Sequence, residues 1–222
     1  MILSQMMLDN IKYIAVDGPI GVGKTSLARM VAEDYKARII YESPDENPFI
    51  QNFYDDPVNH AFQTQLFFLL SRYRQQTELK QQDLFEQKIV CDYVFAKDLI
   101  FARLNLTDDE YTLYSQIYTL LDQRLPKPDV VIFLQASPDI LMKRIKKRCK
   151  GYEKTISPDY VLKVSQAYSQ FYFQYSDTPL LIVNTSGLDF VKHAKDYEML
   201  KKELFTLLKS GKDKHYVTIA PR

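Results

Sequence analysis

A glycine-rich stretch near the start of the chain constrains the fold more than any other feature. Residues 18–25 read Gly-Pro-Ile-Gly-Val-Gly-Lys-Thr and fit the pattern G-x-x-x-x-G-K-[ST] at every specified position. The stretch follows an apolar run at 13–16 and precedes a predicted helix over 24–36, the context in which this pattern binds phosphate groups. The residues expected to hold a nucleotide are Gly18, Gly21, Val22, Gly23, Lys24, Thr25 and Ser26.

Two side chains of this P-loop have expected roles of their own. The Lys24 ammonium is expected to lie near the phosphate that is transferred, which makes Lys24 a predicted catalytic residue. The Thr25 hydroxyl is a candidate ligand of Mg²⁺. A nucleotide and Mg²⁺ are therefore the expected ligands of this loop.

Apolar runs alternate with helical patterns along the chain, which is typical of an α/β fold. The predicted strands are 13–16, 37–42, 88–92, 129–135 and 180–185. The predicted helices are 24–36, 59–82, 94–104, 108–124, 137–148, 158–175 and 189–209. We predict a single domain over 1–222, with a five-stranded parallel sheet of the P-loop NTPase type, helices on both faces and a basic lid. No structure is assigned to the tail 210–222.

The charge balance and the few cysteines and histidines narrow the classes of partner. The formal net charge is +1, which argues against a generally basic nucleic-acid-binding protein. Cys91 and Cys149 lie far apart and the histidines are scattered, so no zinc site is expected. The apolar run 66–70 is too short to span a membrane, and the start of the chain lacks signal-peptide features. We expect a cytoplasmic protein with neither nucleic acid nor membrane as a partner.

The third predicted strand bears on the acceptor of the phosphate. It ends Cys-Asp-Tyr-Val at 91–94, without the Glu after Asp that positions water in many ATPases. The chain also lacks the N-K-x-D and D-x-x-G stretches of GTPases. Water is therefore a poor candidate, and another phosphate or a hydroxyl group is the expected acceptor.

Two carboxylates are the last residues of the second and third predicted strands, where side chains of a P-loop sheet face the phosphates. Asp92 is placed to hold the Mg²⁺ shell, directly or through water, and its alternative role is a helix cap. Glu42 is better placed to accept a proton from an attacking hydroxyl. The alternative for Glu42 is a surface carboxylate at the end of a strand.

The predicted helix 59–82 carries a polar pair among apolar residues. Gln65 and Arg72 lie in one row, two turns apart, and offer the donors and acceptor needed to read a nucleobase edge. Asp98 could hold the Arg72 guanidinium or accept from an exocyclic amine. Phe68 and Phe95 are candidates for stacking on a base, with core packing as the alternative. A solvated edge of an amphipathic helix is the alternative for Gln65 and Arg72.

With these residues assembled, the chain resembles the deoxyribonucleoside kinases, particularly the bacterial deoxyadenosine/deoxyguanosine kinase branch, over about 12–185. The matching stretches are the P-loop, YESPDENPF, FYDDP, AFQTQLFFLLSRYRQQ, CDYVFAKD, RIKKR and SPDYVLKV. The resemblance implies transfer of the ATP γ-phosphate to the 5′-hydroxyl of a deoxynucleoside. Glu42 then matches the general base and Asp92 the acidic residue associated with Mg²⁺. A homodimer formed through helices is also implied.

The resemblance also assigns substrate-binding residues. Gln65 matches the residue that reads the base, and Arg72 and Asp98 match the pair that discriminates between bases. Tyr54 matches the tyrosine that contacts the sugar 3′-hydroxyl, and Asp159 matches its acidic partner. The Arg72 and Asp98 pair favours a purine or cytosine over thymine, and we favour a purine.

One position departs from the family pattern. An Arg usually follows the acid at the end of the third strand, close to the 5′-oxygen, whereas this chain has Tyr93. Our hypothesis is that another cation, from the lid or Lys97, replaces it. A reduced or altered activity is the competing possibility.

The basic segment 143–154 matches the family lid, expected here at about 148–157. Arg144 and Arg148 share a helix face, and a mobile lid Arg offsets charge in the transition state. Arg148 is the first candidate for this catalytic role and Lys150 the second. A solvated helix or a nucleic-acid-binding patch is the alternative.

The most plausible function from sequence is thus a deoxynucleoside kinase, with a purine deoxynucleoside as substrate. A nucleoside monophosphate kinase of the thymidylate type is one alternative, and it would need extra cations to hold an acceptor phosphate. A nucleotide-binding regulatory module without transfer is another.

Overall fold

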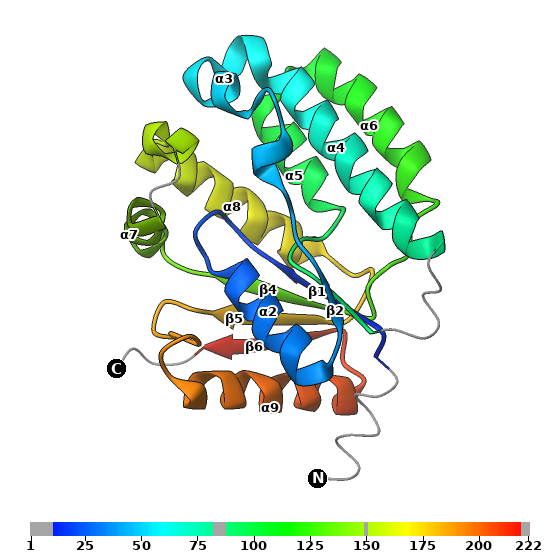
Figure 1. Ribbon diagram of the computed structural model, residues 1–222, viewed down its shortest axis with the longest axis vertical. Helices are drawn as coiled ribbons and strands as arrows, with labels where there is room; N and C mark the ends of the chain where they lie inside the picture. The colour runs from blue at the N-terminus through cyan, green and yellow to red at the C-terminus, as the bar shows by residue number, and fades with distance from the viewer. Residues whose placement is uncertain (1–10, 82–87, 149–150, 219–222) are drawn as a thin grey trace.

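A parallel sheet forms the centre of the molecule (Figure 1). The computed structural model describes residues 11–81, 88–148 and 151–218, and within them the sheet has six strands. These strands are β1 (Tyr13–Asp17), β2 (Arg38–Ile40), β3 (Ile89–Cys91), β4 (Val130–Gln135), β5 (Leu180–Asn184) and β6 (Lys214–Thr218). Their order is β2-β3-β1-β4-β5-β6. The chain therefore places β2 and β3 on one side of β1, and then β4, β5 and β6 on the other side. Such a reversal of strand order opens a crevice at the carboxyl end of β1.

Helices cover both faces of the sheet. The α-helices described are α2 (Lys24–Tyr35), α3 (Ile50–Asp55), α4 (Pro57–Gln81), α5 (Lys97–Asn105), α6 (Asp108–Asp122), α7 (Pro138–Arg148), α8 (Pro158–Gln174) and α9 (Ala194–Ser210). Two short 3₁₀ turns are η1 (Pro44–Glu46) and η2 (Gly151–Thr155). Helices α2 and α9 lie on one face, and α5 and α8 lie on the other (Figure 1). None of the helices described is long and apolar enough to cross a membrane.

The alternation of side chains along the strands builds a core on each face. In β1, Ile14 and Val16 pack toward α2 and α9, whereas Tyr13 and Ala15 pack toward α5 and α8. Every residue of β1 is buried, because helices cover both sides. A third apolar cluster joins α4, α5 and α6 outside the sheet. The predicted α/β fold with a parallel sheet is therefore confirmed.

The prediction of five strands is wrong, because the tail adds β6 at the edge of the sheet. Gly211 ends α9 in the left-handed conformation with φ of 63°, and the chain then turns back to pair with β5. The strand reads Lys-His-Tyr-Val-Thr, and polar residues are common where a strand has a neighbour on one side alone. Its weak apolar pattern is the reason why the sequence does not reveal it.

Other boundaries differ from the predicted ones where the chain leaves a strand or enters a helix. β2 ends at Ile40, so Glu42 lies in the loop after the strand. The short helix α3 is not predicted from sequence and precedes α4, and α9 begins at Ala194 rather than near 189. In contrast, α6 begins at Asp108 as predicted, because Thr107 and Glu110 form a reciprocal capping box.

Candidate active site

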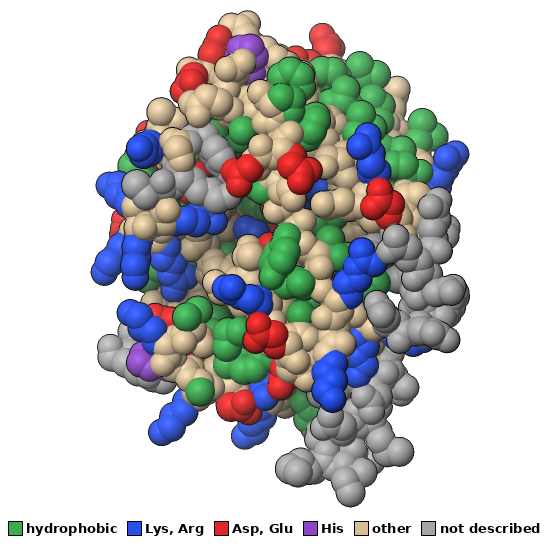
Figure 2. Space-filling view, viewed as in Figure 1, with side chains coloured by type: hydrophobic (Ala, Val, Ile, Leu, Met, Phe, Trp, Pro, Cys, Tyr) green, Lys and Arg blue, Asp and Glu red, His purple; other side chains and the backbone are tan. Residues whose placement is uncertain are grey.

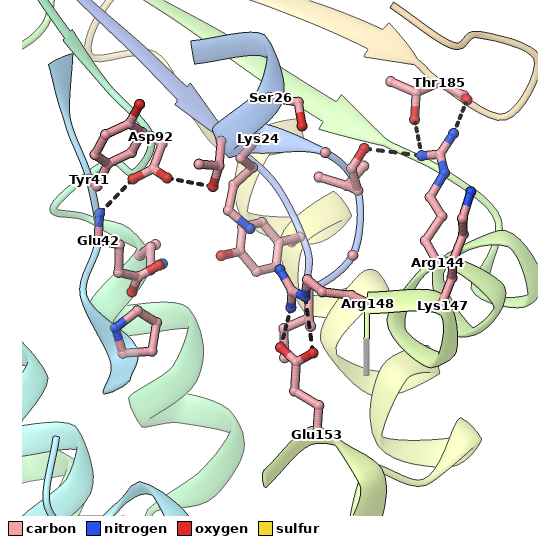
Figure 3. A pocket seen from close by; sticks show the side chains of 18 of the residues that line it. Lys24, Ser26, Tyr41, Glu42, Asp92, Arg144, Lys147, Arg148, Glu153 and Thr185 are labelled. Atoms are coloured by element: carbon pink, nitrogen blue, oxygen red, sulfur yellow. Dashed lines mark hydrogen bonds and ion pairs between the residues drawn. The ribbon is translucent and has the colours of Figure 1, made fainter. Parts of the chain in front are cut away.

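A cavity of about 950 Å³ opens at the carboxyl ends of the strands. Its walls come from the P-loop, the loop after β2, helices α3, α4, α5 and α7, and a segment after β5 (Figure 3). Basic side chains gather beside the hollow on the α7 side (Figure 2). Of the predicted site residues, those lining the cavity are Gly21, Val22, Gly23, Lys24, Thr25, Ser26, Glu42, Tyr54, Gln65, Arg72, Asp92 and Arg148. Gly18, Asp98 and Asp159 are not among the lining residues.

The conformation of the P-loop requires glycine at two positions. Gly18 has φ of 148°, and a Cβ atom there would lie 2.3 Å from the Leu134 carbonyl oxygen. Gly21 has φ of 80°, and a Cβ there would lie 2.8 Å from Ile145 Cγ1. The N-cap of α2 is Gly23, which has no side chain to cap the helix. The N–H groups of the first turn are thus left for an anion such as a phosphate.

Lys24 lies under this loop and contacts its carbonyl groups. Its Nζ donates hydrogen bonds to the Gly18 oxygen at 2.8 Å and the Pro19 oxygen at 3.2 Å. Burial and the positive charge of Lys97 lower the pKa of Lys24 to about 8, although nearby carboxylates oppose the shift. Two ammonium groups, those of Lys24 and Lys97, favour the binding of a multiply charged anion.

Thr25 and Asp92 bring two oxygen ligands together beside the P-loop. The Thr25 hydroxyl donates to Asp92 Oδ2 at 2.6 Å, and the Glu42 backbone N–H donates to Asp92 Oδ1 at 2.7 Å (Figure 3). Helix α5 starts only at Lys97, so Asp92 does not cap it. A hydroxyl and a carboxylate fit Mg²⁺, which takes few protein ligands when phosphates and water supply the others. The described residues contain no cluster of three or more acidic, His or Cys side chains that could hold a metal alone.

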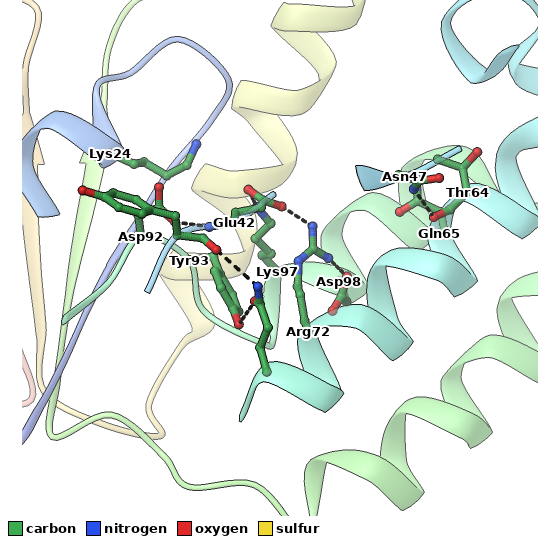
Figure 4. Close-up of polar contacts among 12 residues, drawn as sticks. Lys24, Glu42, Asn47, Thr64, Gln65, Arg72, Asp92, Tyr93, Lys97 and Asp98 are labelled. Atoms are coloured by element: carbon green, nitrogen blue, oxygen red, sulfur yellow. Dashed lines mark hydrogen bonds and ion pairs between the residues drawn. The ribbon is translucent and has the colours of Figure 1, made fainter. Parts of the chain in front are cut away.

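Glu42 lies between two cations rather than at the surface (Figure 4). Arg72 Nη2 donates to Glu42 Oε1, and Lys97 Nζ donates to Glu42 Oε2 at 2.5 Å. Burial raises the pKa of Glu42, but the positive charges of Lys97, Arg72 and Lys24 outweigh it and hold this pKa far below its usual range. Glu42 is therefore ionised, as a general base must be before it accepts a proton.

Arg72 connects Glu42 to a second buried carboxylate. Its Nη1 donates to Asp98 Oδ1, and both side chains are buried. Arg72 Nε and Asp98 Oδ2 are buried without a hydrogen-bond partner among the described residues. Unpaired buried polar groups are costly, and of these two residues Arg72 lines the cavity, where a ligand could complete the pairing of its guanidinium.

Gln65 and Phe68 extend this wall along α4. Gln65 is 3% exposed and lines the cavity, so the pair with Arg72 is not a solvated helix edge. Phe68 also lines the cavity, and its ring centre is 4.7 Å from Arg72 Cζ. In contrast, Phe95 packs in the core against Tyr118, with ring centres 5.2 Å apart.

Tyr93 is fully buried and does not line the cavity. Its hydroxyl donates to Gln75 Oε1 at 2.8 Å and accepts from Gln76 Nε2 at 3.4 Å. The side chain thus stabilises the contact between β3 and α4. It carries no charge and its hydroxyl is directed to α4 rather than to the cavity.

The structure places Glu153, not Asp159, beside the cavity. Asp159 lies in the exposed first turn of α8, after the N-cap Ser157. Glu153 in η2 is 6% exposed and lines the cavity, as Tyr54 of α3 does. Glu153 is not among the residues predicted from sequence, because η2 turns back toward α3 in a way that no local pattern reveals. The sequence feature that could have indicated Glu153 is that it is an acidic residue within the basic segment 143–154.

Arg148 is positioned by Glu153 at the mouth of the cavity. Its Nε donates to Glu153 Oε2 at 3.1 Å, and its Nη2 donates to the other carboxylate oxygen (Figure 3). The Arg148 side chain is 45% exposed, so it has room to turn toward a bound phosphate. Lys150 and Cys149 lie outside the described residues.

Arg144 ties the P-loop to the segment after β5. Its guanidinium donates to the carbonyl oxygens of Val22, Thr185 and Leu188 at 3.0, 3.0 and 3.3 Å, and to the Thr185 hydroxyl at 3.1 Å. These bonds fix the wall of the cavity on the side of α7.

We expect Arg144→Ala to lower ATP affinity roughly tenfold or more, because losing hydrogen bonds to buried groups costs about 1–3 kcal/mol. Isothermal titration with ATP measures this change. The matched control is Lys143→Ala, which removes an exposed cation from the same helix and should bind ATP like the wild type. Equal ATP affinity for the two variants would contradict the role given to Arg144.

Comparison with known proteins identifies the family. A family model described as deoxynucleoside kinase matches residues 14–209. The chain is 34% identical to deoxyguanosine kinase of Bacillus subtilis over 201 residues, which cover 88% of this chain and 97% of the relative. It is 33% identical to deoxyadenosine kinase of Dictyostelium discoideum over 195 residues, covering 86% and 78%. The chain therefore belongs to the deoxynucleoside kinase family.

A solved structure agrees in fold. Deoxyadenosine kinase of M. mycoides, solved with the products dCMP and a flexible dCDP bound, has a TM-score of 0.77 and 26% identity. The alignment covers 87% of this chain and 99% of that one. The prediction that this chain is an ATP-dependent kinase of deoxynucleosides is confirmed by the family and its relatives.

Proposed function

We propose that this enzyme transfers the γ-phosphoryl group of ATP to the 5′-hydroxyl of a purine deoxynucleoside, with Glu42 as the general base. The 5′-oxygen bonds to the γ-phosphorus while the bond from that phosphorus to the β–γ bridging oxygen breaks. The electron pair of the broken bond stays on ADP, and the hydroxyl proton passes to Glu42 and then to solvent. The observation that carries this proposal is that the Glu42 carboxylate, held by Arg72 and Lys97, lines the same cavity as the P-loop.

The donor half of the site would hold the triphosphate. The N–H groups at the start of α2 bind its oxygens, and Lys24 leaves the loop carbonyls to contact the γ-phosphoryl group. Thr25 and Asp92 would hold Mg²⁺, directly or through water, and the ion would neutralise phosphate charge when bound. Arg148 would turn from Glu153 to the transferred group as the lid closes.

The acceptor half would hold the nucleoside. Gln65 and Arg72 line this part of the cavity, so the Gln65 amide and the Arg72 guanidinium, which Asp98 holds, can contact the edge of a base. The Arg72 guanidinium donates to a ring nitrogen or carbonyl of a base, and the Gln65 amide offers both a donor and an acceptor. The deoxyguanosine and deoxyadenosine kinases among the relatives support a purine.

The sugar is expected to lie between α3 and η2. Tyr54 and Glu153 both line this part of the cavity, and we assign the 3′-hydroxyl to them. Glu153 thus takes the place predicted for Asp159, whose side chain is exposed.

An assay of the four deoxynucleosides with Mg²⁺-ATP, read as ADP release, tests the proposal. We expect the fastest ADP release with deoxyadenosine or deoxyguanosine and little with thymidine. Activity with nucleoside monophosphates alone would favour the monophosphate kinase alternative. ATP binding without ADP release for any acceptor would favour the regulatory module.

We also propose a homodimer through α4 and α6. Leu113 and Leu120 of α6 are 50% and 64% exposed, and Leu70 of α4 is 46% exposed. Apolar side chains gather over these helices in Figure 2. An apolar face of this kind supports a protein interface, because exposed apolar patches on soluble proteins are usually small.

The double variant Leu113→Glu/Leu120→Glu is expected to weaken dimerisation roughly 100-fold or more, because it buries two charges in the interface. Sedimentation equilibrium measures the dissociation constant. Leu162→Glu, at a residue of α8 that is 42% exposed, is the control and should leave the dimer intact. A monomeric wild type at micromolar concentration would contradict this proposal.

The cytoplasmic location and the absence of nucleic-acid and membrane partners stay predictions. Arg144, Lys147 and Arg148 line the cavity, where the phosphates of ATP would be their partner in place of a nucleic acid. Cell fractionation tests the location. Titration with DNA and with lipid vesicles tests whether the protein binds nucleic acid or membranes.

A further inference from the structure

A buried lysine lies at the acceptor side of the cavity. Lys97 is the first residue of α5, is 3% exposed and lines the cavity. Its Nζ is 2.5 Å from Glu42 Oε2 and 5.9 Å from the centre of the Phe101 ring, one turn further along the helix. Figure 4 shows Lys97 reaching the same carboxylate as Arg72.

The two cations contact different oxygens of Glu42. Arg72 binds Oε1 and is itself bound to Asp98, so it belongs to the part of the site assigned to the base. Lys97 binds Oε2. A hydroxyl group that delivers its proton to Oε2 must therefore arrive beside the Lys97 ammonium.

Proton transfer moves negative charge away from Glu42 while Lys97 stays in place. Once Glu42 holds the proton, the nearest negative charge lies on the acceptor oxygen and the oxygens of the phosphoryl group. A fixed cation then interacts more strongly with the transition state than with the bound substrate, which is the condition for faster catalysis. Lys24 and Lys97 both line the cavity, so two ammonium groups are available to the phosphoryl group that is transferred.

We propose that Lys97 is a catalytic residue whose ammonium contacts the 5′-oxygen and the phosphoryl group during transfer. This inference rests on the proposed function. It also explains how the chain tolerates Tyr93, whose buried uncharged side chain cannot supply a cation to the cavity. The positive charge at the acceptor oxygen comes instead from the start of α5.

The test is the single-turnover rate of ADP formation, with enzyme in excess over deoxyguanosine and saturating Mg²⁺-ATP. Lys97→Met keeps the length of the side chain and removes the charge. We expect it to lower the rate roughly 10²–10³-fold, the usual cost of one lost transition-state donor, while KM for the deoxynucleoside changes less than about fivefold. Lys97→Arg restores the charge and should recover at least a tenth of the wild-type rate.

Two controls separate catalysis from folding. Lys127→Met removes an exposed lysine that is also bound to a carboxylate, Asp122, and should match the wild-type rate. Unchanged ATP affinity of Lys97→Met in isothermal titration shows that the fold and the donor half are intact.

The inference is overturned if Lys97→Met turns over within threefold of the wild type, or if Lys97→Arg is as slow as Lys97→Met. A rise in KM with an unchanged rate also overturns it, because that result describes ground-state binding. Failure of the proposed function is distinguishable, since the wild type itself would then form no ADP with any deoxynucleoside.

Discussion

Glu42→Gln is expected to lower the single-turnover rate of ADP formation by roughly 10²–10⁴-fold, the usual contribution of a positioned general base. The amide cannot accept the proton of the 5′-hydroxyl, although it keeps the size of the side chain. ATP affinity should change far less than the rate, because the donor site that we propose consists of the N–H groups at the start of α2 and Lys24, on which Glu42 acts as a nearby charge. Rapid-quench kinetics gives the rate, and isothermal titration gives the affinity.

Glu46→Gln is the matched control for this prediction. Glu46 lies in η1, a few residues further along the same loop, and is exposed outside the cavity. The Glu46→Gln variant should form ADP at the wild-type rate. A Glu42→Gln enzyme as fast as this control would exclude Glu42 as the base.

Arg72→Met is expected to destabilise the fold by about 3–5 kcal/mol, because it removes one partner of a buried ion pair and leaves Asp98 unpaired. For a chain of this size the melting temperature should fall by roughly 6–20 °C. Activity should also fall, since Arg72 holds Glu42 and lines the cavity. Differential scanning calorimetry measures the change in stability.

Two further variants make this prediction specific. Arg74→Met removes an exposed cation from the same helix and should melt within about 2 °C of the wild type, since surface changes usually cost less than about 0.5 kcal/mol. Adding Asp98→Asn to Arg72→Met removes the unpaired buried charge and should recover part of the lost stability. If Arg72→Met alone melts like the wild type, the ion pair does not stabilise the fold as we infer.

Local patterns in the sequence predict the conformation of the P-loop and the residues that line the cavity beside it. The P-loop pattern specifies its own backbone, because the glycines and the start of α2 are adjacent in the chain. The ends of parallel strands lie at one edge of the sheet, so the strand pattern brings Glu42 and Asp92 together near the P-loop, although β2 ends at Ile40 and Glu42 lies in the loop that follows. The spacing of Gln65 and Arg72 likewise places both on one side of α4.

Features that depend on long-range contacts could not be predicted in the same way. Glu153 reaches the cavity because η2 turns toward α3, whereas the Asp159 chosen from sequence lies on an exposed helix turn. The orientation of Tyr93 depends on two glutamines of α4 that are its partners. The strand β6 is specified by its pairing with β5 more than by its own polar sequence.

The position of the Glu42 carboxylate relative to the acceptor hydroxyl is the central claim. A crystal structure with a purine deoxynucleoside, Mg²⁺ and a non-hydrolysable ATP analogue tests it most directly. We expect a Glu42 oxygen about 2.6–3.2 Å from the 5′-oxygen, with that oxygen in line with the γ-phosphorus. A Glu42 carboxylate turned away from the 5′-hydroxyl, or a nucleoside bound outside the cavity, would contradict the account.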